Sequence, residues 1–167
     1  MNRRVEGPMK IFCTINSKPK ILDVPANLTL IELLHSQGLW SVKRGCENGD
    51  CGNCAVIVDG QAAYSCLILA VQVEGKSIET FERINSSKKY THLKEVFMHY
   101  GDIECGYCVA GLMMSIKALL DSISDPTEEE VVDALAGNVC RCAKRSLPVA
   151  DIIEAIQKMR GNFNNRI

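Results

Sequence analysis

The chain has 167 residues, of which 47% are hydrophobic and 23% charged, and these values are ordinary for a globular protein. The 19 basic and 20 acidic side chains give a formal net charge of −1, without the basic excess typical of nucleic-acid-binding proteins. No apolar run approaches the roughly 20 residues of a membrane span, and no apolar segment follows Arg3 and Arg4 as in a secretory signal. We therefore expect a cytoplasmic protein without nucleic-acid or membrane partners.

The first predicted elements are two strands and a helix. In chain order they begin with a strand over 10–15, a turn over 16–19 and a strand over 20–24. Thr29 and Glu32 have the spacing of a capping box, in which each side chain accepts a hydrogen bond from the backbone N–H of the other. We therefore predict a helix that begins after Thr29, runs through Gln37 and ends at Gly38.

A glycine-rich loop over 45–54 follows, and then the chain returns to strands. In order these are a strand over 55–58, a turn at Asp59-Gly60, a strand over 61–65 and a strand over 77–81. Several short strands crossed by one helix indicate a small β-grasp sheet. We expect this sheet to form an N-terminal domain over 8–83.

The second half of the chain has a helical period after a polar linker over 85–89. The predicted helices are one over 109–120, one that follows a cap at Asp125 and closes at Gly137, and one over 149–159. In the second of these, Pro126 takes the first helical position and Glu128 the third. We expect a four-helix bundle over 84–160 and a flexible tail over 161–167. The predicted fold class is therefore α+β, with strands preceding helices.

Nine cysteines are present, and closely spaced thiols in a reducing cytosol indicate metal ligands rather than disulfides. Four of them have the spacing of a plant-type ferredoxin, in which thiolates bind a 2Fe–2S cluster; they are Cys46, Cys51, Cys54 and Cys66. Three glycines let backbone N–H groups approach an anionic cluster; they are Gly45, Gly49 and Gly52. Zinc favours paired CxxC motifs, so this spacing disfavours a zinc site.

A second group consists of Cys105 and Cys108 with Cys140 and Cys142. This CxxC-plus-CxC spacing is less diagnostic, and by itself it leaves a zinc site open. The first two cysteines lie at the start of the predicted helix over 109–120, where the positive end of the helix favours an anionic cluster. The other two lie between the last two predicted helices.

Over nearly its whole length the chain resembles the small iron–sulfur subunit of the molybdenum hydroxylases, the xanthine dehydrogenase family. The matching stretches are Ser41-Val42-Lys43-Arg44-Gly45-Cys46, Asp50-Cys51-Gly52-Asn53-Cys54, Cys105-Gly106-Tyr107-Cys108 and Gly137-Asn138-Val139-Cys140-Arg141-Cys142. The resemblance implies two 2Fe–2S clusters on the eight cysteines of the two groups. It also implies a large molybdopterin subunit and a medium FAD subunit as partners, in a dimer of heterotrimers.

The chain departs from the family pattern near the second group. Glu104 stands where the family usually has Gln, Val109-Ala110 replaces Thr-Pro, and Ala143-Lys144-Arg145 replaces Thr-Gly-Tyr. In the family these positions lie near the molybdopterin. The resemblance therefore implies that Glu104 and Cys142 contact the molybdopterin, and that the Cys46 loop faces the flavin.

The predicted function is electron relay, without catalysis by the chain alone. The sequence contains no GxGxxG fingerprint and no recognisable substrate pocket or nucleophile. Purine is the favoured substrate of the complex, and an aldehyde, carbon monoxide or another heteroaromatic compound remains an alternative. Two further hypotheses are a free-standing ferredoxin and an interaction module with zinc in the second site.

The remaining cysteine and the histidines are assigned structural roles. Cys13 falls on the apolar face of the first strand, so we expect a buried thiol. A Rieske centre needs two histidine ligands, but no Cys-x-His pair accompanies His35, His92 or His99. We expect all three histidines on helix surfaces or in the core.

Overall fold

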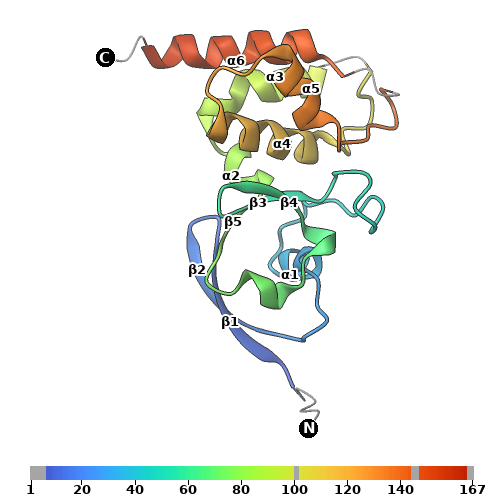
Figure 1. Ribbon diagram of the computed structural model, residues 1–167, viewed down its shortest axis with the longest axis vertical. Helices are drawn as coiled ribbons and strands as arrows, with labels where there is room; N and C mark the ends of the chain where they lie inside the picture. The colour runs from blue at the N-terminus through green and yellow to red at the C-terminus, as the bar shows by residue number, and fades with distance from the viewer. Residues whose placement is uncertain (1–6, 100–101, 144–146, 165–167) are drawn as a thin grey trace.

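The computed structural model describes residues 7–99, 102–143 and 147–164. A sheet region and a helical region lie one above the other along the long axis of the molecule (Figure 1). The strands precede most of the helices in the chain, which confirms the predicted α+β class. None of the described helices is long and apolar enough to span a membrane.

The sheet is mixed and has five strands in the order β2-β1-β5-β3-β4. Their bounds are β1 Met9–Ile15, β2 Lys18–Val24, β3 Ala55–Val58, β4 Gln61–Tyr64 and β5 Ser77–Glu79. Strand β1 pairs in parallel with β5, and the other pairs are antiparallel. Two short 3₁₀ turns, η1 (Ser65–Leu67) and η2 (Ala70–Val73), connect β4 to β5.

The turn between β1 and β2 is tighter than predicted. Asn16 and Ser17 have φ values of 49° and 65°, and β2 already begins at Lys18. Positive φ at both central residues matches the twist of a two-residue hairpin, so the predicted turn over 16–19 was too long. Pro19 of β2 pairs with Thr14 of β1. Because β2 is an edge strand, proline is tolerated there.

Helix α1 (Leu30–Ser36) packs against the sheet and begins as predicted. Thr29 is its N-cap, and the capping box with Glu32 is present in both directions. Gln37 is the C-cap and Gly38 follows with φ 79°, which confirms the predicted end. The buried face of α1 joins the β1 residues Ile11, Cys13 and Ile15 in one core.

The helical region contains more helices than the sequence predicted individually. They are α2 (Phe81–Asn85), the 3₁₀ turn η3 (Lys88–Tyr90), α3 (Thr91–His99), α4 (Val109–Ser122), α5 (Glu128–Leu135) and α6 (Val149–Asn164). Much of the expected linker over 85–89 therefore belongs to α2 and η3. Helix α6 includes residues 161–164, so the predicted tail over 161–167 was too long, and residues 165–167 lie outside the described part of the chain.

The cap of α5 also differs from the prediction. Thr127, not Asp125, is the N-cap, and it forms a capping box with Glu130. The side chain of Asp125 instead makes an ion pair with Arg160 of α6. Two S/T/D-x-x-E pairs overlap in this stretch, and the structure uses the one closer to the apolar residues of α5.

One strand joins the two halves of the molecule. Ala55 and Ile57 of β3 are buried in the core formed with the helices, whereas Val56 belongs to the core formed with α1. Successive side chains of a strand point to opposite faces of a sheet. Strand β3 therefore has an apolar layer on each side, and α4 packs on the face opposite α1.

Candidate metal centres

The cysteines of the first group lie in the loop before β3 (Cys46, Cys51 and Cys54) and in η1 (Cys66). Cys54 and Cys66 come together with their Sγ atoms 3.3 Å apart, and the Cys51 thiol is close enough to Cys46 to help lower the pKa of the Cys46 thiol. Between them Gly49 and Gly52 have φ values of 89° and 67°. This left-handed backbone turns N–H groups toward the sulfurs, as in an anion-binding nest.

The backbone around Cys46 favours a thiolate. Desolvation alone would raise the pKa of Cys46, but hydrogen bonds from Asn48, Cys51 and Asp50 lower it to about 7. By contrast, burial and the neighbouring Cys54 raise the pKa of Cys66 to about 12. The four thiols of this group repel one another once ionised, so a bound cation is needed to hold all of them as thiolates.

The cysteines of the second group lie where the sequence predicted, at the start of α4 and between α5 and α6. Cys108 is the residue directly before α4, and burial together with Cys140 raises its pKa to about 12. The Sγ atoms of Cys105 and Cys142 are 3.6 Å apart. The backbone N–H of Ala143 donates to the Cys140 sulfur over 3.3 Å.

Both groups therefore contain two close pairs of thiols. All nine cysteines of the protein are free thiols. Within the described residues no three or more His, Cys, Asp or Glu side chains converge on a single ion-sized position. A 2Fe–2S cluster contains two metal ions and four protein thiolates, and the two pairs of thiols in each group match that number of ligands.

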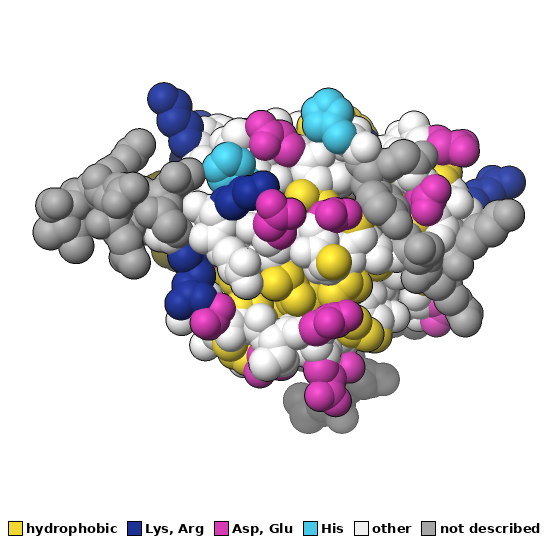
Figure 2. Space-filling model, turned by 90° about the horizontal axis from the view of Figure 1, so that it is seen from above, with side chains coloured by type: hydrophobic (Ala, Val, Ile, Leu, Met, Phe, Trp, Pro, Cys, Tyr) yellow, Lys and Arg dark blue, Asp and Glu magenta, His cyan; other side chains and the backbone are white. Residues whose placement is uncertain are grey.

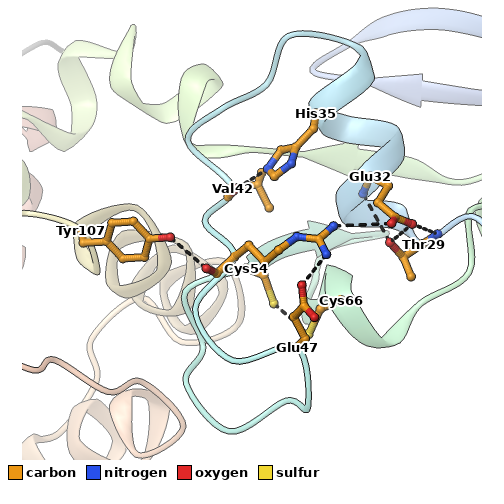
Figure 3. Close-up of polar contacts among 9 residues, drawn as sticks. Thr29, Glu32, His35, Val42, Glu47, Cys54, Cys66 and Tyr107 are labelled. Atoms are coloured by element: carbon orange, nitrogen blue, oxygen red, sulfur yellow. Dashed lines mark hydrogen bonds and ion pairs between the residues drawn. The ribbon is translucent and has the colours of Figure 1, made fainter.

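The two cysteine loops touch each other. The backbone N–H of Val139 donates to the carbonyl oxygen of Cys51 over 3.0 Å. Tyr107 reaches from the helical region to the first loop (Figure 3), and its hydroxyl donates to the carbonyl of Arg44 over 2.9 Å. The sequence motifs contained these residues, but nothing in their spacing predicted a contact between the loops.

The other singled-out residues have the following positions. Glu104 is exposed, as is Cys105 beside it, and Cys142 is partly exposed. Cys13 is completely buried, which confirms the structural thiol. Val109, Ala110 and Ala143 are buried, and Lys144 and Arg145 lie outside the described residues.

Two of the histidines lie beside polar or aromatic partners away from the cysteines. His35 Nε2 is 2.6 Å from the carbonyl of Val42, and its ring stacks on Trp40. His92 lies 3.5 Å from Glu95 on α3. His92 and Glu95 also line a surface cavity of about 300 Å³ between α3 and α6, with His99, Asp151, Glu154 and Lys158. On this end of the molecule, charged and histidine side chains surround a hydrophobic patch (Figure 2).

Two family profiles match the chain. Residues 13–80 match a domain described as a 2Fe-2S iron-sulfur cluster binding domain, and residues 80–157 match a second 2Fe-2S binding domain. The chain is therefore an iron–sulfur protein with two 2Fe–2S-binding domains, one built around each cysteine group.

Similar proteins are subunits of oxidoreductases. The chain is 38% identical over 159 residues to the nicotine 6-hydroxylase small subunit of Paenarthrobacter nicotinovorans, covering 95% of this chain and 93% of that one. It is 41% identical over 146 residues to the xanthine dehydrogenase iron-sulfur-binding subunit of Escherichia coli O157:H7, covering 86% and 92%. This protein belongs to the family of small iron–sulfur subunits of molybdenum hydroxylases.

Solved structures agree with this assignment. The chain superposes on quinoline 2-oxidoreductase from Pseudomonas putida 86 with a TM-score of 0.83 and 34% identity, covering 93% of this chain and 98% of that one. It superposes on the aldehyde oxidoreductase from Desulfovibrio gigas with a TM-score of 0.82 and 32% identity. This superposition covers 92% of this chain and 17% of the longer aldehyde oxidoreductase chain.

Proposed function

We propose that the chain relays electrons between a molybdopterin subunit and an FAD subunit of a xanthine dehydrogenase-type hydroxylase. The observation that carries this proposal is the hydrogen bond from Val139 N–H to the Cys51 carbonyl. It joins the residue next to Cys140, in the second group, directly to a cysteine of the first group. Two redox centres bridged in this way suit transfer within the chain better than two independent carriers.

The proposed ligands are the four pairs of thiols. Cys46 with Cys51 and Cys54 with Cys66 would hold one cluster in a domain over 8–83. Cys105 with Cys142 and Cys108 with Cys140 would hold the other in a four-helix domain over 84–160. When bound, each cluster would supply one-electron oxidation and reduction. The backbone N–H groups that donate to Cys46 and Cys140 would stabilise the negative charge of the sulfurs.

Exposure suggests which partner each group faces. Cys105 is exposed next to Glu104 and its partner Cys142 is partly exposed, whereas Cys108 and Cys140 are buried. We propose that Glu104 and Cys142 contact the molybdopterin subunit, and that the Cys46 loop faces the FAD subunit. The complete complex would be a dimer of these three-subunit units.

Purine hydroxylation is the activity that we propose for the complex. The similarity to a xanthine dehydrogenase iron-sulfur-binding subunit supports it. A second candidate is another heteroaromatic substrate, because the nicotine 6-hydroxylase small subunit and quinoline 2-oxidoreductase are similar to this chain at comparable identity. The chain itself contributes electron transfer in either case.

Co-purification from the native host tests this function. A tagged chain should bring down a molybdopterin protein and a flavoprotein, and the complex should hydroxylate a purine in a substrate screen. If the complex hydroxylates only nicotine-like or quinoline-like compounds, the proposed relay stands and the proposed purine substrate is wrong. A cluster-loaded chain that purifies without either partner and reduces unrelated reductases would instead indicate a free-standing ferredoxin.

A further inference from the structure

One face of α4 contacts both cysteine loops. Gly111 and Ser115 are four residues apart, so they lie on the same face of the helix, one turn from each other. Both are buried. Gly111 lies against the first loop: a Cβ atom on Gly111 would be 2.5 Å from the carbonyl oxygen of Gly52 and 3.0 Å from Cα of Asn53. Only a residue without a side chain allows this approach.

Ser115 holds the second loop. Its Oγ accepts a hydrogen bond of 2.8 Å from Nδ2 of Asn138, and both side chains are buried. Asn138 is followed by Val139, which donates to the Cys51 carbonyl, and then by Cys140. The peptide of Gly52 packs against this same segment, because a Cβ on Gly52 would be 2.6 Å from the Gly137 carbonyl oxygen.

The first loop is thus held between α4 on one side and residues 137–139 on the other. The atoms in contact with Gly111 belong to the backbone, so they cannot rotate away as the end of a long side chain could. Interiors packed at this density transmit a displacement rather than absorbing it. A methyl group at position 111 would therefore push the loop that carries Cys51 away from α4, whose first residue follows Cys108.

We propose that Gly111 and Ser115 are positioning residues that set the separation of the two iron–sulfur clusters, and thereby the rate of electron transfer between them. The inference rests on the proposed relay function. Gly111 limits the distance by permitting close approach, and Ser115 keeps the Asn138–Cys140 segment on the same helical face. Neither residue is a thiolate ligand.

The test uses the full chain with both clusters reduced. The magnetic dipolar splitting between two paramagnetic clusters falls with the inverse cube of their distance, so it reports their separation without turnover. We expect Gly111→Ala to retain its iron and to show a smaller splitting than the wild type. Hydrogen exchange should be faster in the peptide containing Val139, because displacement of the first loop distorts the hydrogen bond from the Val139 N–H to the Cys51 carbonyl. Electron transfer between the clusters should be slower.

Ser115→Ala is the second variant, and it removes a hydrogen-bond partner without adding volume. We expect it to broaden the distribution of splittings, since Asn138 is no longer held. Ser122→Ala is the matched control: it lies on the same helix, at the exposed far end. It should leave the splitting and the exchange unchanged.

Gly111→Ala with full iron content and an unchanged splitting would overturn the proposal. If Gly111→Ala loses a cluster, Ser115→Ala decides: an altered splitting supports the proposal, and an unaltered one rejects it. If the wild-type chain binds two clusters and neither variant changes the splitting, the positioning role is refuted and the relay function is not. A wild-type chain that never binds two clusters would refute the relay function itself.

Discussion

Cysteines of one chemical type have different surroundings in this protein. Cys46 is hydrogen-bonded by backbone N–H groups that lower its pKa to about 7, against the desolvation that would raise it. Cys13, on β1, is completely buried, and this burial raises the pKa of its thiol. A lowered pKa at Cys46 suits the ligand role that we propose for it, whereas the buried neutral thiol of Cys13 behaves as a small apolar side chain.

Cys51→Ser tests this difference for a proposed ligand. The hydroxyl is a poorer ligand than a thiolate, so iron should fall from about four to about two atoms per chain. In the assembled complex, substrate should still reduce the second cluster, and reduction of the flavin should become much slower. Iron analysis and rapid-mixing paramagnetic resonance measure both effects.

The matched control is Cys13→Ala, which should retain its full iron content and lose only stability. Flavin reduction at the normal rate in the Cys51→Ser complex would show that the first cluster is not on the route.

Glu104→Gln tests the departure from the family pattern at the exposed edge of the second group. An ionised carboxylate only accepts hydrogen bonds, whereas an amide also donates them. Because Glu104 is exposed, the change in unfolding free energy should stay within about 0.5 kcal/mol. Both clusters should remain, and electron transfer from the molybdopterin subunit should change modestly. Loss of the second cluster would show that Glu104 supports the cluster itself.

Among the elements, the ends of helices and the base of the first loop depend on a few hydrogen bonds. The N–H of Glu130 donates to Thr127 Oγ1 at the start of α5, over 3.3 Å. Ser41, just before the first cysteine loop, donates from its N–H and its hydroxyl to Glu82 of α2, over 2.9 and 2.6 Å. The two hydrogen bonds from Ser41 to Glu82 thus connect the base of the first loop to α2, the first helix after the sheet.

Thr127→Ala should destabilise α5, because it removes the N-cap oxygen of the capping box. The expected loss is about 1 kcal/mol of unfolding free energy, measured by denaturant titration. Asp125→Ala is the control, since it removes only a surface ion pair with Arg160 and should lose less. The opposite order would mean that Asp125 is the cap after all.

Glu82→Gln should change how stability depends on pH. Desolvation would raise the pKa of Glu82, but hydrogen bonds from Ser41 and Thr80 hold it below its ordinary value of 4.5. A lowered folded-state pKa stabilises the fold above pH 4.5, and this stabilisation is lost as the pH falls through the folded-state pKa.

The wild type should therefore exceed the variant in unfolding free energy at neutral pH, and the difference should shrink in acid. The difference between the two proteins is the measured quantity, because acid releases sulfide from the clusters of both. A constant difference across this range would contradict the role assigned to the carboxylate.

At the scale of the whole molecule, the sheet serves two cores at once, with α1 on one face and α4 on the other. The two cysteine groups meet where α4 crosses the sheet, and they differ in their access to solvent. Cys105 is exposed in the second group, whereas none of the four cysteines of the first group is more than partly exposed. The isolated chain should therefore protect its two clusters unequally.

An iron chelator should remove the second cluster from the isolated chain before the first. In the complete complex, a partner that covers Glu104 and Cys105 should slow this loss, whereas the first cluster should be affected less. Cluster-resolved paramagnetic resonance during chelation follows both. Faster loss of the first cluster would show that exposure of the thiols does not control release.

Local features of this protein follow from the sequence by itself. The spacing of eight cysteines, the capping box at Thr29 and the alternation in β1 each depend on residues close together in the chain, so the pattern of residue types determines them. The tight turn at Asn16-Ser17, the cap at Thr127 and helix α2 were missed where several local patterns compete and packing selects one.

Only the tertiary structure decided how the cysteine groups are related. Tyr107 contacts Arg44, Val139 contacts Cys51, and Gly111 contacts Gly52, in each case across many residues of intervening chain. Such contacts depend on the path by which α4 crosses the sheet, because side chains and carbonyls distant in sequence meet only after both cores have packed. The cysteine spacing in the sequence therefore predicted which residues bind the clusters. The packing of α4 on β3 decided that the two cysteine groups lie against each other.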